Sequence, residues 1–214
     1  MNLSRNNFGF DEHNEVQGHY YSVTELFVSQ NKTLEELNLN DCRLGPEGAA
    51  ILGRSLRRNQ KICKLYLSQN RFEDRGLHHI LEGILDNIQT SAQLSGDKII
   101  VSPIQEVDLS KNGIELVNHT VLKTLCAILT CQESNMQMLS LRDNLIRDDP
   151  ADAINVALKV NMSLLKFQID MNPIKHATIK ELELSVKRNV QRYKEKQGPL
   201  IKREIRSLYK ERQK

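Results

Sequence analysis

The chain contains no tryptophan, and aromatic residues make up only 5% of its 214 residues. A compact domain of this length could bury a large core, whereas a solenoid buries a thin continuous core in which Leu and Ile dominate. No run of about 18 apolar residues occurs, so the sequence predicts no membrane span. The opening residues, MNLSRNNFGF, lack the apolar stretch of a secretory signal peptide.

Cysteine is also scarce. The four residues Cys42, Cys63, Cys126 and Cys131 do not show the spacing of a disulfide framework. Disulfides are rare in reducing compartments, so we expect a cytoplasmic protein with reduced thiols.

Sequence motifs of common nucleotide-binding and catalytic sites are absent. The sequence has no phosphate-binding loop, no dinucleotide fingerprint, no G-x-S-x-G and no H-E-x-x-H. His78 and His79 are neighbours, and on a helix they would point about 100° apart, so they do not converge on one metal ion. We therefore predict a protein that is not an enzyme, with no cofactor, no metal site and no small-molecule substrate.

What the chain does contain is a repeated unit. Its clearest copy spans residues 33–59, TLEELNLNDCRLGPEGAAILGRSLRRN. Leu37 and Leu39 alternate with polar residues, as in a strand, whereas Leu52 and Leu56 lie four residues apart, as on a helix. A strand followed by a helix cannot bury its own apolar face and must stack on neighbouring units.

The unit returns at a period of about 28 residues, with one longer interval, which is the signature of a repeat architecture. The strand positions of the later copies are Leu65 and Leu67, Val107 and Leu109, Leu139 and Leu141, and Phe167 and Ile169.

Each copy has one polar residue where the chain turns off the strand. An asparagine amide at this point can donate to and accept from backbone groups that have lost their ladder partners. We interpret these residues as structural: Cys42, Asn70, Asn112, Asn144 and Asn172.

The period, the long helix and the segment LNLNDCRLGPEGAAILGRSLRRN resemble the ribonuclease-inhibitor type of leucine-rich repeat. The resemblance covers most of residues 1–189. It implies an α/β solenoid of about six units, with a parallel sheet on the concave face, helices on the convex face and a basic C-terminal helix. Proteins similar to this are mostly binding scaffolds, and some organise the cytoskeleton or ciliary axonemes.

Two segments depart from the regular repeat. Leu3 and Asn6 match Leu39 and Cys42, so we expect the chain to begin inside a strand, either as a fragment of a longer array or with its end covered by another chain. Residues 87–103 exceed the period, and we interpret them as a surface loop.

Residues 190–214 form a basic tail. From residue 187 onward the chain has eleven Lys or Arg against three Glu. We expect a break at Gly198-Pro199, followed by a short amphipathic helix bearing Lys202, Arg203, Arg206 and Lys210. This tail caps the solenoid, binds an acidic partner, or is a solvated helix. Nucleic acid and membrane binding rank lower, because no nucleic-acid module and no bulky anchor accompany the charge.

Function is expected to lie on a surface. Between the inward leucines, the strands expose residues that form columns on the concave face, and Tyr66 is the only aromatic residue among them. The alternative is binding by the convex helices or an edge. The predicted protein-binding residues are Glu36, Asn38, Asn40, Lys64, Tyr66, Glu106, Asp108, Ser140, Arg142, Gln168 and Asp170.

These features predict a non-catalytic scaffold that binds another protein, within a ciliary, axonemal or other cytoskeletal assembly. A basic tail would suit an acidic tubulin surface. The alternative function is regulation of a small GTPase, since one branch of similar proteins activates the GTPase Ran. That branch typically ends in an acidic segment, whereas this chain ends in a basic one.

Overall fold

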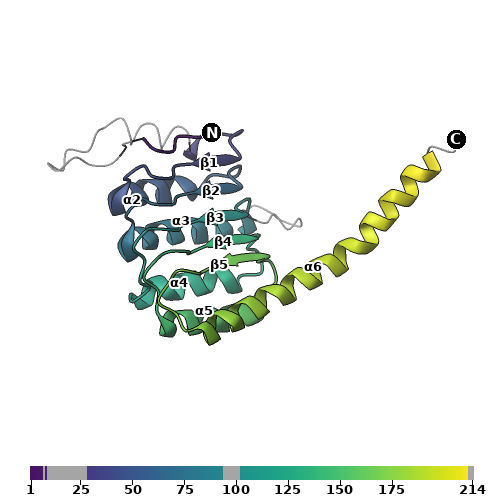
Figure 1. Cartoon of the computed structure of the whole chain (residues 1–214). Coiled ribbons are helices and arrows are strands. Elements are labelled where there is room, and N and C mark those ends of the chain that lie inside the picture. The colour runs from purple at the N-terminus through teal and green to yellow at the C-terminus, as the bar shows by residue number, and fades with distance from the viewer. Residues whose placement is uncertain (7, 9–27, 94–101, 212–214) are drawn as a thin grey trace.

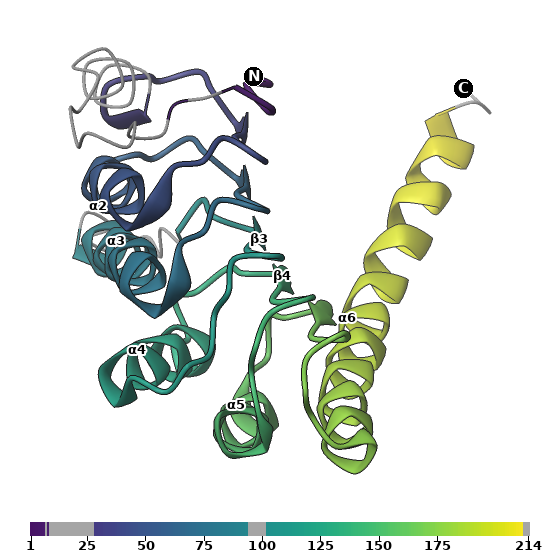
Figure 2. The same cartoon turned by 60° about the vertical axis from the view of Figure 1, so that its left-hand side comes forward.

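The computed structural model describes residues 1–6, 8, 28–93 and 102–211. Strand–helix units stack along one axis (Figure 1). Figure 2 shows the strands along one side of the stack and the helices that follow the first four strands along the other, whereas the C-terminal helix extends on the strand side. This arrangement is the predicted α/β leucine-rich repeat solenoid.

In the described residues the sheet has five parallel strands in the order β1-β2-β3-β4-β5. Leu37 pairs with Leu65, Leu65 with Val107, and Val107 with Leu139. The inward residues of the repeat therefore lie side by side, and the register predicted from the sequence is confirmed. The strands are β1 (Glu36–Asn38), β2 (Lys64–Tyr66), β3 (Glu106–Asp108), β4 (Met138–Ser140) and β5 (Lys166–Gln168).

The first residues of the chain add a further position to this sheet. Asn2 forms an isolated parallel bridge with Asn38, and the Leu3 N–H donates to the Asn38 carbonyl at 2.8 Å. Asn6 Nδ2 donates to the Leu3 carbonyl, as later asparagines do in their own repeats. The match between this segment and the type repeat is thus present in the structure.

The helices begin with ordinary initiation chemistry. Pro46 lies in the first turn of α2, and the Asn118 side chain caps α4 by accepting from the Thr120 N–H. Asp148 and Asp149 place negative charge at the start of α5. The helices are α2 (Gly45–Leu56), α3 (Glu73–Gln93), α4 (His119–Thr130), α5 (Asp148–Val160) and α6 (His176–Glu211).

Asparagines stack in a ladder behind the strands. Asn112 Nδ2 donates to the carbonyls of Leu67 and Leu109, both at 3.0 Å, and its Oδ1 accepts from the Asn70 N–H at 2.8 Å. The amide thus joins two repeats and satisfies backbone groups that no strand reaches, as predicted. In the first full repeat Cys42 donates its thiol to the Leu3 carbonyl at 3.1 Å.

A second set of asparagines lies at the opposite edge of the repeats, with Asn161 at the end of α5 and Asn189 within α6. Asn161 Nδ2 donates to the Leu129 carbonyl at 2.7 Å, and its Oδ1 accepts from the Leu164 N–H at 2.8 Å. Asn189 repeats this role one unit later by donating to Asn161 Oδ1 and to the Leu164 carbonyl. Buried amides therefore join neighbouring repeats at both edges of the solenoid. The sequence predicted only the set that follows the strands.

Helices α2 and α3 approach each other through glycines. A Cβ at Gly83 would lie 2.8 Å from Gly53 Cα, and a Cβ at Gly53 would lie 2.8 Å from the His79 carbonyl carbon. Only residues without a Cβ allow the two backbones to come this close.

Two expectations about irregular segments differ from the structure. Helix α3 continues to Gln93, so the first part of the expected loop over residues 87–103 is helical, with Asn87 buried against α2; residues 94–101 lie outside the described residues. Helix α6 runs without a break through Gly198-Pro199 to Glu211. A proline inside a helix removes one hydrogen bond and can be accommodated without ending the helix.

Candidate protein-binding faces

The concave residues lie in the columns that the sequence predicts. Glu36 pairs with Lys64 and Lys64 with Glu106, while Asn38 pairs with Tyr66. Side chains on one face of neighbouring parallel strands lie within contact distance, so each column forms a continuous surface. The second column continues from Tyr66 to Asp108, from Asp108 to Ser140 and from Ser140 to Gln168.

Tyr66 lies in a small polar cluster near the middle of this surface. Its hydroxyl donates to Glu106 Oε2 at 3.2 Å, and Lys64 Nζ lies 3.1 Å from Glu106 Oε1. Burial, and then the Glu106 carboxylate, raise the pKa of the Tyr66 hydroxyl, while the hydrogen bond to Glu106 raises the pKa of Lys64. The hydrogen bond to Glu106 restrains the half-buried ring. Tyr66 therefore loses little conformational entropy when it contacts a partner.

Several other predicted residues accept hydrogen bonds from backbone N–H groups at the strand ends. Asn38 Oδ1 accepts from the Asn40 N–H at 3.0 Å, and Asn40 Oδ1 accepts from the Ser68 N–H at 2.7 Å. Asp108 Oδ1 accepts in the same way from the Ser110 N–H. The structure gives these three side chains a role in shaping the strand ends, which alternation along the strand does not reveal.

A second charged group lies at the β5 end of the concave surface. Arg142 Nε lies 2.8 Å from Asp170 Oδ2, and Arg142 Nη2 lies 3.3 Å from the Met171 sulfur. Lys111 and Asp143 make a longer pair nearby at 3.9 Å. Exposed ion pairs of this kind contribute about 0–1 kcal/mol each to the stability of the fold. A binding partner can therefore replace them at little energetic cost.

The predicted tail residues Lys202, Arg203, Arg206 and Lys210 fall on the backbone of α6, but their side chains lie outside the described residues. Helix α6 itself projects beyond the stacked repeats (Figure 1).

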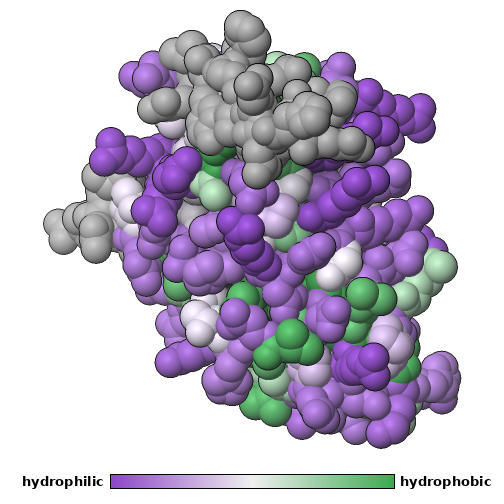
Figure 3. Space-filling model, turned by 90° about the vertical axis from the view of Figure 1, so that its left-hand side faces the viewer, coloured by the Kyte–Doolittle hydropathy of each residue, from purple (hydrophilic) through white to green (hydrophobic). Residues whose placement is uncertain are grey.

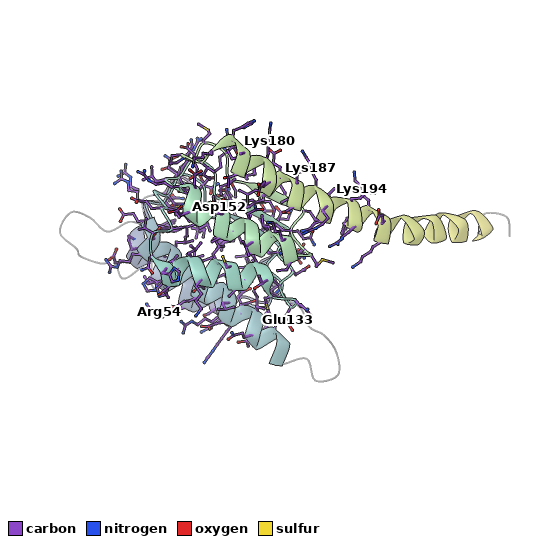
Figure 4. All side chains as sticks on the ribbon, turned by 90° about the horizontal axis from the view of Figure 1, so that it is seen from below. Arg54, Glu133, Asp152, Lys180, Lys187 and Lys194 are labelled. Carbon is purple, nitrogen blue, oxygen red and sulfur yellow. The ribbon has the colours of Figure 1, made fainter. Side chains whose placement is uncertain are left out.

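The part of α6 with described side chains is also basic. Lys180, Lys187 and Lys194 recur at heptad spacing, and Figure 4 shows them in a row along α6 on the side away from Asp152 of α5. Arg188 lies on another side, where its guanidinium donates to the carbonyls of Leu158 and Lys159 at 2.8 and 2.7 Å. Arg188 therefore joins α6 to the end of α5. The three lysines form an exposed basic row, in which Lys187 Nζ lies 3.5 Å from Glu183 Oε2.

Burial favours the neutral forms of the four cysteines and of His79. Burial raises the pKa of each cysteine, which lowers its thiolate fraction, and burial together with His78 lowers the pKa of His79. Within the described ranges no group of three or more His, Cys, Asp or Glu could hold a metal ion. None of the helices that the structure describes is both long and apolar enough to cross a membrane.

Comparisons with known proteins agree with the repeat geometry. A family model described as Leucine Rich repeat matches residues 30–52. The mouse protein "NACHT, LRR and PYD domains-containing protein 14" is 23% identical over 192 residues, covering 80% of this chain and 18% of that protein. The human protein "NACHT, LRR and PYD domains-containing protein 5" is 26% identical over 136 residues, covering 62% of this chain and 10% of that protein. The chain thus spans less than a fifth of the length of these relatives.

Solved structures share the fold over most of the chain. "Leiomodin-1 Actin-Binding Site 2 (ABS2)" superposes with a TM-score of 0.62 at 15% identity, covering 86% of this chain and 95% of that one. The tropomodulin C-terminal domain of Caenorhabditis elegans gives a TM-score of 0.58 at 14% identity, covering 83% and 97%. Sequence matches, fold matches and the asparagine-linked repeats lead to one conclusion: the chain has the α/β leucine-rich repeat fold.

Proposed function

We propose that this protein is a non-catalytic scaffold that binds a cytoskeletal protein through its concave face. The observation that carries the proposal is the cluster of Tyr66, Lys64 and Glu106 near the centre of that face. Aromatic residues with a polar tip, held among charged neighbours, are frequent anchors of protein interfaces.

The cytoskeletal part of the proposal rests on the kind of protein that shares the fold. One of the similar structures is named as an actin-binding site of leiomodin, and another is a tropomodulin domain. A fold alone does not fix a function, so actin is the first probe to test. Axonemal tubulin is the second probe, because the exposed row Lys180, Lys187 and Lys194 on α6 suits an acidic surface.

The test is co-sedimentation of the purified chain with actin filaments and, separately, with microtubules. We expect saturable binding to one of them, with Tyr66→Ala weakening it at least about tenfold, as removal of an interface anchor does. Tyr66→Phe keeps the ring and loses only the hydrogen bond to Glu106, so it should bind better than Tyr66→Ala. Gln89→Ala, an exposed change on α3, is the matched control.

Three outcomes count against the proposal. Binding to neither polymer removes the cytoskeletal assignment, and equal binding by Tyr66→Ala moves the site away from the concave face. Accelerated GTP hydrolysis by a small GTPase, measured with the same purified chain, would favour the regulator function instead.

A further inference from the structure

The loops that lead from the strands into the helices form one edge of the solenoid. The helices begin at the left of Figure 1, so Figure 3 shows this edge from the front. Hydrophobic groups are exposed in the lower half of the view, over the later repeats, whereas the described upper half is mainly hydrophilic. This edge is separate from the concave face of the proposed function.

One loop on this edge is longer than its counterparts. Asn112 and α4 are separated by the Gly113–Asn118 loop, while the loop between Asn144 and α5 is shorter. Asp74, at the start of α3, holds the longer loop in place. Its Oδ1 accepts from the N–H groups of Glu115 and Leu116 at 2.9 and 2.8 Å, and its Oδ2 accepts from the Asn118 N–H at 3.2 Å.

The loop is also conformationally constrained. Leu116 has φ of 58°, in the left-handed region, and its side chain is buried. Such a backbone costs about 1–2 kcal/mol for a residue other than glycine. The three hydrogen bonds to Asp74 and the burial of Leu116 offset this cost, so the loop is a fixed wall at the edge of the solenoid.

Beside this wall lies a hollow of about 350 Å³, bounded by the loop, the start of α3 and Leu145 of the next repeat. Two large apolar side chains are exposed around it, Val117 at 74% and Leu145 at 51%. Arg43 and Arg71 occupy the position that corresponds to Leu145 in two earlier repeats. The apolar lining is therefore particular to this point of the array.

The rim of the hollow is negatively charged. Glu73 and Glu115 belong to its lining, and in the described part of the chain no ion pair neutralises either carboxylate. The single basic residue of the lining, Arg75, is paired with Glu47 at 3.0 Å. An occupant that brings positive charge next to an apolar group would complement both the walls and the rim.

We infer that this hollow binds a short segment of a partner protein that presents an aliphatic or aromatic side chain next to a lysine or arginine. The volume lies at the lower end of the roughly 300–1,000 Å³ of ligand sites, which suits a few side chains and not a folded domain. Val117 and Leu145 contact the apolar group, and Glu73 and Glu115 contact the cation. The protein thus has a second binding site on its edge, independent of the concave face.

The test is selection from a random heptapeptide library displayed on phage, with the full chain as bait. We expect enriched peptides to combine basic and large apolar residues, and a synthetic copy of one should bind the chain with saturation in calorimetry. Leu145→Arg is the decisive variant, because the Leu145 side chain is 51% exposed and an arginine there need not disturb the core. It should retain the thermal midpoint of the parent and weaken peptide binding at least tenfold.

Two more variants separate the contributions. Glu115→Gln should weaken the same peptide severalfold and reduce the salt dependence of its binding, because the cation loses its partner. Tyr66→Ala should leave peptide binding unchanged, which distinguishes this site from the proposed concave one.

The inference is overturned if no peptide is enriched, if the enriched peptides are acidic, or if Leu145→Arg binds them as the parent does. A concentration-dependent dimer that Leu145→Arg abolishes, measured by analytical ultracentrifugation, would replace the peptide with a second copy of this chain.

Discussion

Substituting Gly83 by alanine tests the tightest contact in the solenoid, the crossing of α2 and α3. The added Cβ would meet the Gly53 carbonyl oxygen and would lie 2.8 Å from both the carbonyl carbon and Cα of Gly53. Ordinary van der Waals contact begins at 3.4 Å. The obstacle is backbone, which cannot rotate away as a side chain can, so the two helices must move apart.

The size of the effect follows from two opposing contributions. Alanine favours a helix over glycine by about 1 kcal/mol, which would stabilise α3 if space were available. Overpacking a core contact costs typically about 1–3 kcal/mol, and a separation of roughly 1 Å forfeits up to half of the dispersion energy across the contact. Because Ile80, Leu52 and Leu56 are buried along these helices, we expect the cost to exceed the gain and a net loss of about 2 kcal/mol.

The assay is urea denaturation followed by circular dichroism, which gives the free energy of unfolding from the midpoint and slope. Gln89→Ala, also on α3 but exposed, is the control and should stay within about 0.5 kcal/mol of the parent. Gly53→Ala should behave like Gly83→Ala, since its Cβ would meet the His79 backbone. A Gly83→Ala variant as stable as the parent, or more stable, would show that the helices do not approach this closely.

Three further predictions concern the repeat itself. Leu141→Ala removes a fully buried strand side chain and should lower the free energy of unfolding by about 2–5 kcal/mol in the same titration; an unchanged value would contradict the strand register. Asn112→Ala leaves the buried Asn70 N–H without its acceptor and removes one of two amide donors from each of the Leu67 and Leu109 carbonyls, so it should cost about 3 kcal/mol; a neutral result would mean that the ladder does not stabilise the turns. The N–H of Lys175, and then its side chain, lower the pKa of Asp148. Asp148 therefore stabilises the fold above the ordinary aspartate value of 3.8 and loses this contribution as the pH falls below it, so Asp148→Asn should flatten the acid limb of a plot of thermal midpoint against pH.

The period of the sequence determined the main part of the fold. Alternation at Leu37 and Leu39 and the four-residue spacing of Leu52 and Leu56 depend only on local geometry, and their recurrence fixes which residues stack. The column of Glu36, Lys64 and Glu106 follows directly from that register, and the structure shows the same pairs. The role of Asn112 also follows, because every copy of the turn leaves the same backbone groups without partners.

Only the tertiary structure decided which further contacts join neighbouring units and which surfaces remain open. The Arg188 guanidinium bonds to the end of α5, Asp74 holds a loop of the next repeat, and Gly53 meets the α3 backbone. Each contact joins residues far apart in the sequence, and none leaves a periodic pattern. The continuity of α6 through Pro199 belongs here too, since a proline signals a break locally while the helix as a whole can accommodate it. A repeat therefore specifies its own stacking, whereas departures from the repeat acquire their roles only when the units are packed against one another.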